Sequence, residues 1–363
     1  MCESGEGAGA GRLMPRGALS SAVLKVVDMH TAGEPVRIVE AGYPELRGAT
    51  ILEKRRDAQA RLDHLRRTLM LEPRGHAGMY GVIPTTPCRP DADLAVLFTH
   101  QEGYSTMCGH ATIAIGRWAA DTGRVRMIDG RAALALEAPC GLVRVEVTAT
   151  EAGPPLVAFE SVESFAHRLD AETDVAGLGR VRFDIAFGGA YYAILPASRI
   201  GLPLMTTPLD QLVGAGVAIT EAVRTSMPIR HPQEPDLGFL YGTILTDDVS
   251  LGAAVAGPSY NLCVFAEGQI DRSPTGSGVT ARLALAAARG EMAVGQSHEI
   301  RGVSGQAFVG ALASVRASAG GPISRVRVAG QAFYSGRAEF VSEAADPFAE
   351  GFALPARFSD LAG

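Results

Sequence analysis

Two short segments carry the side chains best suited to acid–base chemistry. Cys108 and Thr275 each stand directly before a glycine, and an apolar run follows within a few residues. The N-terminus of a helix carries unpaired N–H groups and partial positive charge, so it attracts anions. Two such ends facing one cavity would hold an anionic substrate between a thiol and an alcohol. This difference between the two side chains is the main indication of the reaction.

Cys108 is the better candidate for a nucleophile or a base. A free thiol titrates near pH ~8.5, and a helix N-terminus can lower that value. A lone cysteine is more often buried and inert. Here Gly109 and His110 follow at once, and packing alone would favour an apolar residue in place of the histidine. The pattern therefore favours a functional thiol.

Thr275 occupies the matching place, but its alcohol is far too weak an acid to ionise at neutral pH. It can donate and accept hydrogen bonds, and the simplest interpretation is a threonine that caps a helix. The small residues at 276–278 leave backbone N–H groups room to approach a carboxylate. Asp271 either binds a ring ammonium or lies in a solvated turn, and His110 could hydrogen-bond the same nitrogen.

Composition excludes several classes of protein. The chain has 363 residues, enough for two domains, and a net charge of −6 gives no reason to expect a nucleic-acid partner. No apolar run is long enough to span a membrane. The five cysteines form no C-x-x-C pair and the histidines show no metal-binding spacing, so the sequence predicts no metal site. It predicts that the thiols are reduced and that the protein is cytoplasmic. Residues 1–20 lack a signal-peptide core and are expected to form a disordered tail, with a weak organelle-targeting signal left open.

The two motifs need buried elements to position them. Residues 109–122 and 276–289 are apolar on nearly all faces, which predicts two buried helices. Further helices are expected at 57–71, on the surface, and at 209–223. Alternating apolar residues and glycine-rich turns predict many short strands, at residues 23–29, 36–40, 94–99, 134–138, 141–148, 156–162, 180–187, 191–195, 237–246, 261–265, 297–302, 307–315 and 323–330.

A weak internal repeat indicates two similar domains. Residues 28–39 align at constant offset with residues 184–195, and each half then delivers one of the two motifs. We therefore expect an α+β fold with antiparallel strands around one buried helix in each domain, and a ligand cleft between the domains. The expected domains are residues 21–175 with Cys108 and residues 176–334 with Thr275. Residues 335–363 either complete the first domain or stay with the second.

Four separated motifs, in this order, resemble the proline racemase family over nearly the whole chain, from about residue 26 to 340. They are DMHTAGEP at 28–35, EPRGHAGMYG at 72–81, MCGHATIA at 107–114 and DRSPTGSG at 271–278. The resemblance implies the diaminopimelate-epimerase-like fold of two pseudo-symmetric domains, with neither metal nor pyridoxal phosphate as cofactor. Racemases and epimerases of this family use two cysteines, one on each face of the substrate α-carbon. Here the second is replaced by Thr275, and this Cys/Thr pair resembles the trans-3-hydroxy-L-proline dehydratase branch.

The resemblance also implies roles for individual residues. Cys108 matches the group that accepts the α-proton, and Asp271 matches the acid that binds the ring nitrogen. Gly109 and His110 match the segment that meets the carboxylate and the ring nitrogen. Gly276 and Ser277 match the backbone cradle for the carboxylate. Tyr80 and Phe265 match the aromatic groups that lie over the ring.

Three activities stay open at this point. The favoured hypothesis is a hydro-lyase that removes the α-proton of trans-3-hydroxy-L-proline and eliminates the 3-hydroxyl as water, giving Δ1-pyrroline-2-carboxylate. A one-base epimerase or racemase of proline or 4-hydroxyproline would need a substitute acid on the Thr275 face. A binder of cyclic imino acids without turnover would have no need of a thiol at Cys108. The acid that protonates the leaving hydroxyl is left open between Cys108, Thr275 and water, and the oligomeric state is open too, a homodimer being one arrangement.

Overall fold

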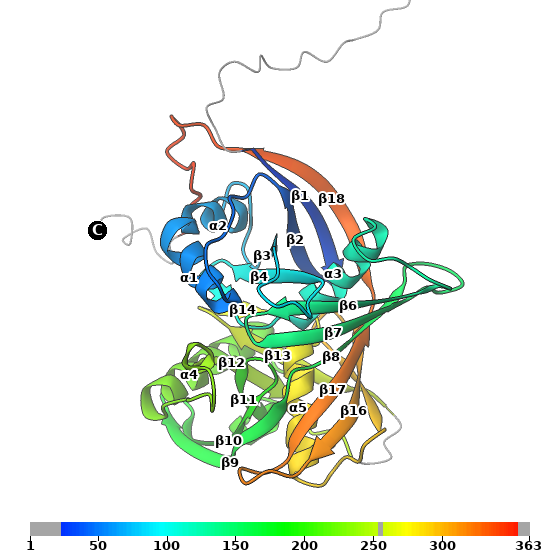
Figure 1. Ribbon diagram of the computed structural model, residues 1–363. Coiled ribbons are helices and arrows are strands. Elements are labelled where there is room, and N and C mark those ends of the chain that lie inside the picture. Colours follow the sequence, from blue (N-terminus) through cyan, green and yellow to red (C-terminus); the bar gives the residue numbers. More distant parts are fainter. Residues whose placement is uncertain (1–22, 253–256, 355–363) are drawn as a thin grey trace, which may run out of the picture.

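The computed structural model describes residues 23–252 and 257–354, so the expected tail at residues 1–20 lies outside the described residues. The chain forms two β-rich halves, one above the other in Figure 1. The upper half contains β1 to β8, three helices and the last strand. Its elements are β1 (Val23–Thr31), β2 (Glu34–Ala41), α1 (Ile51–Arg61), α2 (Asp63–Met70), β3 (Tyr80–Thr85), β4 (Leu94–His100), β5 (Gly103–Ser105), α3 (Gly109–Asp121), β6 (Arg131–Ala138), β7 (Gly141–Thr148), β8 (Leu156–Glu160) and β18 (Ala332–Val341).

The lower half contains the remaining strands, two α-helices and two 3-10 turns. Its elements are β9 (Ser164–Val175), β10 (Gly179–Phe187), β11 (Tyr191–Pro196), η1 (Ala197–Ile200), α4 (Leu209–Ser226), η2 (Pro235–Leu237), β12 (Leu240–Thr246), β13 (Ser259–Phe265), β14 (Gln269–Ile270), α5 (Gly276–Ala288), β15 (Ser297–Arg301), β16 (Ala307–Arg316) and β17 (Ile323–Gly330). Strand β17 pairs with both β8 and β9, so one hydrogen-bonded network runs through both halves.

The two apolar helices are buried, as the sequence predicts. Helix α3 packs against β1, β2, β7, β8 and β18, and the indole ring of its Trp118 is fully buried. Helix α5 packs against β9, β10, β16 and β17, with Val279 and Leu283 in the same apolar cluster as α3. A helix without a polar face is stable only inside a protein. This burial fixes where both helices begin, and therefore where the two motifs lie.

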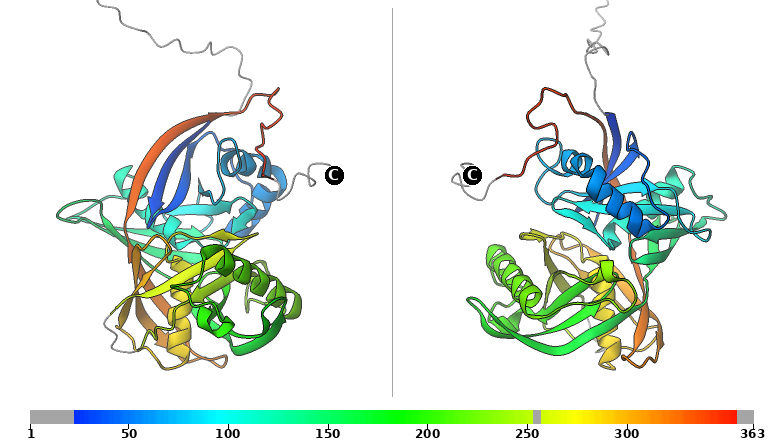
Figure 2. Two further views of the ribbon diagram at one scale, coloured as in Figure 1. Left: turned by 180° about the vertical axis from the view of Figure 1, so that it is seen from behind. Right: turned by 60° about the vertical axis from the view of Figure 1, so that its left-hand side comes forward.

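The repeated segments both form antiparallel hairpins. In the upper half β1 pairs with β2, and in the lower half β10 pairs with β11. The last strand, β18, pairs with β1 along its length, so residues 332–341 return to the upper half. Figure 2 shows β18 beside β1 from two further directions.

Three expectations about the elements are corrected. The single surface helix expected at 57–71 is two helices, because a capping box of Thr50 and Glu53 starts α1 earlier and Leu62 leaves helical geometry. Its second part, α2, buries Leu65, Leu69 and Met70. Strands β3, β5, β9, β14 and β18 were not expected. Strand β9 pairs with β10 across the division expected at 175/176, so residues 164–175 lie with the lower half.

Candidate active site

Cys108 is positioned by the first turn of α3. It occupies the N-cap position, with extended backbone, and its sulfur accepts the Ala111 N–H at 3.4 Å. The Thr112 hydroxyl donates to the Cys108 carbonyl at 2.7 Å, which ties the next turn of the helix to the cap. The sulfur therefore lies at the positive end of a buried helix, where a thiolate is stabilised.

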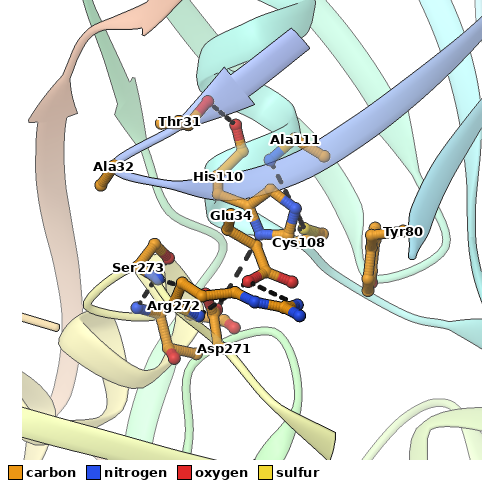
Figure 3. A network of polar contacts seen from close by, with 12 residues as sticks. Thr31, Ala32, Glu34, Tyr80, Cys108, His110, Ala111, Asp271, Arg272 and Ser273 are labelled. Carbon is orange, nitrogen blue, oxygen red and sulfur yellow. Dashed lines mark hydrogen bonds and ion pairs between the residues drawn. The ribbon is translucent and has the colours of Figure 1, made fainter. Parts of the chain in front are cut away.

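The Cys108 sulfur has two polar side chains beside it. His110 Nδ1 lies 3.1 Å away, and the Tyr80 side chain lies beside Cys108 in the same cavity (Figure 3). Burial raises the pKa of the Cys108 thiol well above its usual value, and the Ala111 N–H and the Tyr80 hydroxyl act in the opposite direction. Burial lowers the pKa of His110, against the pull of Asp271. At neutral pH the pair in this structure is a thiol and a neutral imidazole.

Thr275 stands at the matching position of α5 but does not cap it. Its backbone has φ 63° and ψ 93°, a left-handed conformation that is unusual for a β-branched residue. The side chain makes no capping hydrogen bond, and the buried hydroxyl oxygen has no well-aligned partner among the described residues. The capping role that the sequence suggested is therefore wrong. A strained backbone and an unpartnered hydroxyl are typical of a functional position.

The loop before α5 holds Thr275 in this conformation. Asp271 accepts the Ser273 N–H at 2.8 Å, and the Ser273 hydroxyl accepts the Thr275 N–H at 3.1 Å. Asn261 on β13 donates to the Pro274 carbonyl at 2.9 Å. These bonds offset a local strain of about 1–3 kcal/mol and direct the hydroxyl into the cavity.

A small cavity of about 20 Å³ lies between the two halves at these helix ends. It brings together every predicted site residue except Gly276, which instead touches Gly109 backbone to backbone. Both helix N-termini therefore open onto one space, as expected for a carboxylate site. The lining is Glu34, Tyr80, Met107, Cys108, Gly109, His110, Tyr192, Tyr241, Cys263, Phe265, Asp271, Thr275 and Ser277.

Asp271 and His110 face each other across the boundary between the halves. His110 Nδ1 lies 3.9 Å from an Asp271 carboxylate oxygen, and both side chains are buried. The gap is too long for a hydrogen bond. A secondary ammonium between the two groups would face a carboxylate and a neutral imidazole, both of which accept hydrogen bonds.

Five lining residues had no role in the sequence interpretation: Glu34, Met107, Tyr192, Tyr241 and Cys263. Glu34 was visible inside the first motif, and burial together with Asp271 raises the pKa of its carboxyl well above the usual value. Tyr192 forms a 2.7 Å hydrogen bond with Ser277. Cys263 is a second buried thiol in the cavity. Burial raises the pKa of the Cys263 thiol, and its contact with the Thr275 hydroxyl acts in the opposite direction. The two tyrosines and Cys263 carried no local signal, because only strand pairing brings them here.

Hydrogen bonds join the two halves next to the cavity lining. Gln269 donates to the Gln101 side-chain oxygen at 2.7 Å, and the Glu267 N–H donates to Glu102 at 2.7 Å. Arg272 donates to the Gly78 carbonyl at 2.9 Å. These contacts hold the two halves together beside the cavity. Carbanion chemistry benefits when water is excluded from such a site.

Among residues 23–252 and 257–354, no group of three or more His, Cys, Asp and Glu side chains is placed to hold a metal ion. Within the same residues, no helix is both long and apolar enough to cross a membrane.

Comparison with known proteins gives the family. The family model for proline racemase matches residues 26–353. A human trans-3-hydroxy-L-proline dehydratase is 47% identical over 341 residues, covering 92% of this chain and 95% of that protein. A dehydratase of the same name from Colwellia psychrerythraea is 39% identical, covering 90% of this chain and 92% of the relative.

Solved structures give the same result. A probable proline racemase from Agrobacterium radiobacter, solved with bound carbonate, superposes with a TM-score of 0.85 at 29% identity and covers 91% of this chain and 96% of its own. A hydroxyproline epimerase from Agrobacterium vitis, solved with trans-4-hydroxy-L-proline, superposes with a TM-score of 0.84 at 25% identity. The match covers 93% of this chain and 97% of that structure's chain. The two β-rich halves, the motifs and these matches together place the chain in the proline racemase family.

Proposed function

We propose that this protein is a trans-3-hydroxy-L-proline dehydratase, a hydro-lyase that produces Δ1-pyrroline-2-carboxylate. The observation that carries the proposal is the unequal pair at the two helix ends. Cys108 offers a thiol and Thr275 an alcohol to one buried cavity. The relatives named as dehydratases, at 39–47% identity, support the same activity.

The lining suits a cyclic imino acid. The N–H groups at the starts of α3 and α5 would bind the carboxylate, with Gly109, Gly276 and Ser277 leaving room for close approach. Asp271 and His110 would hold the ring nitrogen between them. Tyr80 and Phe265 would cover the ring with aromatic surface.

The reaction then follows from the positions of the acids and bases. Cys108, as thiolate, removes the α-proton, and the donors at the two helix ends stabilise the negative charge that develops on the carboxylate. The hydroxyl on C3 is β to this carbanion and leaves as water once it has been protonated. The resulting enamine tautomerises to the cyclic imine. Thr275 is too weak an acid to deliver a proton to the opposite face, so inversion is suppressed while elimination proceeds.

A second candidate is an epimerase of proline or 4-hydroxyproline, and one observation favours it. Cys263 lines the cavity beside Thr275, so a thiol is present on the face where inversion needs a proton donor. In that case solvent deuterium would enter the α-position with inversion, and Cys263→Ala would abolish the incorporation. Exchange with retention would exclude this candidate.

The proposal extends to the architecture and to the cofactors. We infer two pseudo-symmetric domains of the diaminopimelate-epimerase type, each with strands around one central helix. The twin hairpins β1–β2 and β10–β11 and the two buried helices support this arrangement. The thiol, the helix ends and the buried acids can supply every step above, so we propose catalysis without a metal or pyridoxal phosphate.

The test is a direct assay of product. Purified protein is incubated with the proline, 3-hydroxyproline and 4-hydroxyproline isomers, and any cyclic imine is trapped with o-aminobenzaldehyde. We expect imine from trans-3-hydroxy-L-proline alone. Clean epimerisation of proline or 4-hydroxyproline with no imine would overturn the proposal.

A further inference from the structure

The stereochemistry of the substrate restricts where the acid for the leaving group can lie, if the proposed function holds. At C2 of the pyrrolidine ring, the α-hydrogen and the carboxylate occupy opposite faces. A trans 3-hydroxyl lies on the face opposite the carboxylate, and therefore on the same face as the α-hydrogen. Because Cys108 removes that hydrogen, the acid must stand on the Cys108 side of the cavity. Thr275, on the opposite side of the cavity, is therefore excluded.

Four residues on this side of the cavity carry titratable groups: Glu34, Tyr80, Cys108 and His110. Cys108 holds the α-proton at the moment when the hydroxyl leaves. Neutral His110 points Nδ1 at the Cys108 sulfur, 3.1 Å away. One Glu34 oxygen accepts the Arg272 N–H at 2.7 Å and the Arg272 guanidinium at 3.3 Å. Figure 3 shows Glu34 directed toward that guanidinium and Tyr80 beside Cys108.

We propose that the Tyr80 hydroxyl protonates the departing 3-hydroxyl, and that the Cys108 thiol then restores the proton to Tyr80. The α-hydrogen thus passes from carbon to sulfur, from sulfur to the phenolate oxygen, and a proton leaves in the product water. The C2–H and C3–O bonds break, the C2–C3 double bond forms, and both side chains finish in their starting states. The step needs no oxidant, reductant or other co-reactant.

The surroundings of Tyr80 support this role. Its hydroxyl hydrogen-bonds to the Ser105 hydroxyl on β5, and its side chain lines the same cavity as Cys108 and lies beside it (Figure 3). The side chain is 3% exposed, and the His110 ring packs edge-on against it at 4.9 Å. Burial raises the pKa of Tyr80 well above its usual value, which keeps the phenol protonated at neutral pH. A phenol is ordinarily a far stronger acid than water, so it can protonate a departing hydroxide.

The test separates protonation of the leaving group from every other role of Tyr80. Tyr80→Phe keeps the ring and removes only the acid. It is assayed with trans-3-hydroxy-L-proline and with trans-3-fluoro-L-proline, because fluoride leaves as a stable anion without needing a proton. We expect a loss of about 10²- to 10⁴-fold in kcat with the hydroxy substrate, the usual contribution of a general acid. The loss with the fluoro substrate should be much smaller.

Tyr241→Phe is the matched control, since Tyr241 lines the same cavity from the lower half. Its effect on the two substrates should be equal. Deuterium exchange is a second readout: in D₂O, unreacted trans-3-hydroxy-L-proline should gain α-deuterium with Tyr80→Phe, because the carbanion forms but elimination is stalled.

Equal losses on both substrates with Tyr80→Phe would overturn the proposal, and Tyr80 would then act on Cys108 or on binding. The same selective loss with Glu34→Gln instead would assign the acid to Glu34. If the wild-type protein released neither water nor fluoride, the proposed function itself would fail, which is a different result.

Discussion

Gly109 and Gly276, the first residues of α3 and α5, touch each other backbone to backbone where the two helix N-termini meet. A β-carbon added to Gly276 would lie 2.6 Å from the Gly109 Cα, closer than any ordinary contact, and one added to Gly109 would meet Gly276 in the same way. The contact lets both helix ends open onto one cavity. It also couples the position of Cys108 directly to that of Thr275.

We predict that Gly276→Ala removes nearly all activity while the protein still folds. The added methyl group forces the two helix ends apart, and overpacking of this kind costs about 1–3 kcal/mol. Circular dichroism would report the fold, and thermal unfolding the stability. Gly214→Ala in α4 is the control, because its β-carbon would meet no other atom within 4 Å. That change should stabilise the helix by about 0.5–1 kcal/mol and leave activity intact, whereas an active Gly276→Ala enzyme would contradict the model of two converging helix ends.

The second prediction concerns pH. Because the thiolate is the base and burial raises the pKa of Cys108, kcat/KM should rise with pH through the neutral range. Asp271 contributes to that raised pKa through its negative charge. Asp271→Asn should therefore move the rising limb to lower pH while increasing KM for the substrate. A pH profile of kcat/KM measures both effects, and an unmoved limb would show that Asp271 does not act on the thiol.

Cys108→Ser provides the control for that experiment. A serine hydroxyl does not ionise in this range, so the rising limb should disappear along with almost all activity. A variant with wild-type activity would exclude Cys108 as the base and would favour a role in binding alone.

How much the sequence could predict depended on whether the signal was local. The apolar pattern of residues 109–122 and 276–289 predicted both buried helices within a residue of their ends, because a helix without a polar face is stable only in a protein interior. Strand β9 was missed because its solvent-exposed polar residues look like those of a loop. The amphipathic pattern at 57–71 predicts a helix start later than the observed one, because the capping box of Thr50 and Glu53 precedes that pattern.

The same difference between local and non-local signals applies to the site residues. Cys108, Asp271 and Thr275 lie in contiguous motifs, so the sequence could bring them to attention. Cys263 and Tyr192 reach the cavity only through the pairing of β11, β12 and β13, and no periodic pattern reports such contacts. The left-handed backbone of Thr275 is likewise invisible in the sequence, because the surrounding loop imposes it.

Thr275→Cys is predicted to gain racemase or epimerase activity with L-proline or 4-hydroxyproline. The change places a thiol opposite Cys108, so that one sulfur can remove the α-proton and the other can return a proton on the far face. Chiral chromatography measures the inversion, and Thr275→Ser, which keeps an alcohol, is the control. No inversion with Thr275→Cys would mean that this residue does not separate the two chemistries.

The last prediction concerns stability and centres on His100, which lies behind the cavity at the end of β4. Burial, with Arg66 and Arg55 nearby, lowers the pKa of His100 from 6.5 to about 3. Between these two values the unfolded chain binds a proton that the folded protein does not. Stability from this group is therefore complete above pH 6.5 and falls as the pH drops toward 3, by at most about 1.4 kcal/mol per pH unit.

His100→Gln should flatten the dependence of the unfolding free energy on pH within this window, because the amide does not titrate. Urea unfolding at several values between pH 6.5 and 4 measures the slope, and His64→Gln on the exposed face of α2 is the matched control. An equal slope for wild type and His100→Gln would show that His100 is protonated in the folded protein. In that case the charge would sit against the aromatic rings of Tyr80, Tyr241 and Phe265, whose centres lie about 6 Å from the imidazole, and the same substitution would alter catalysis as well as stability.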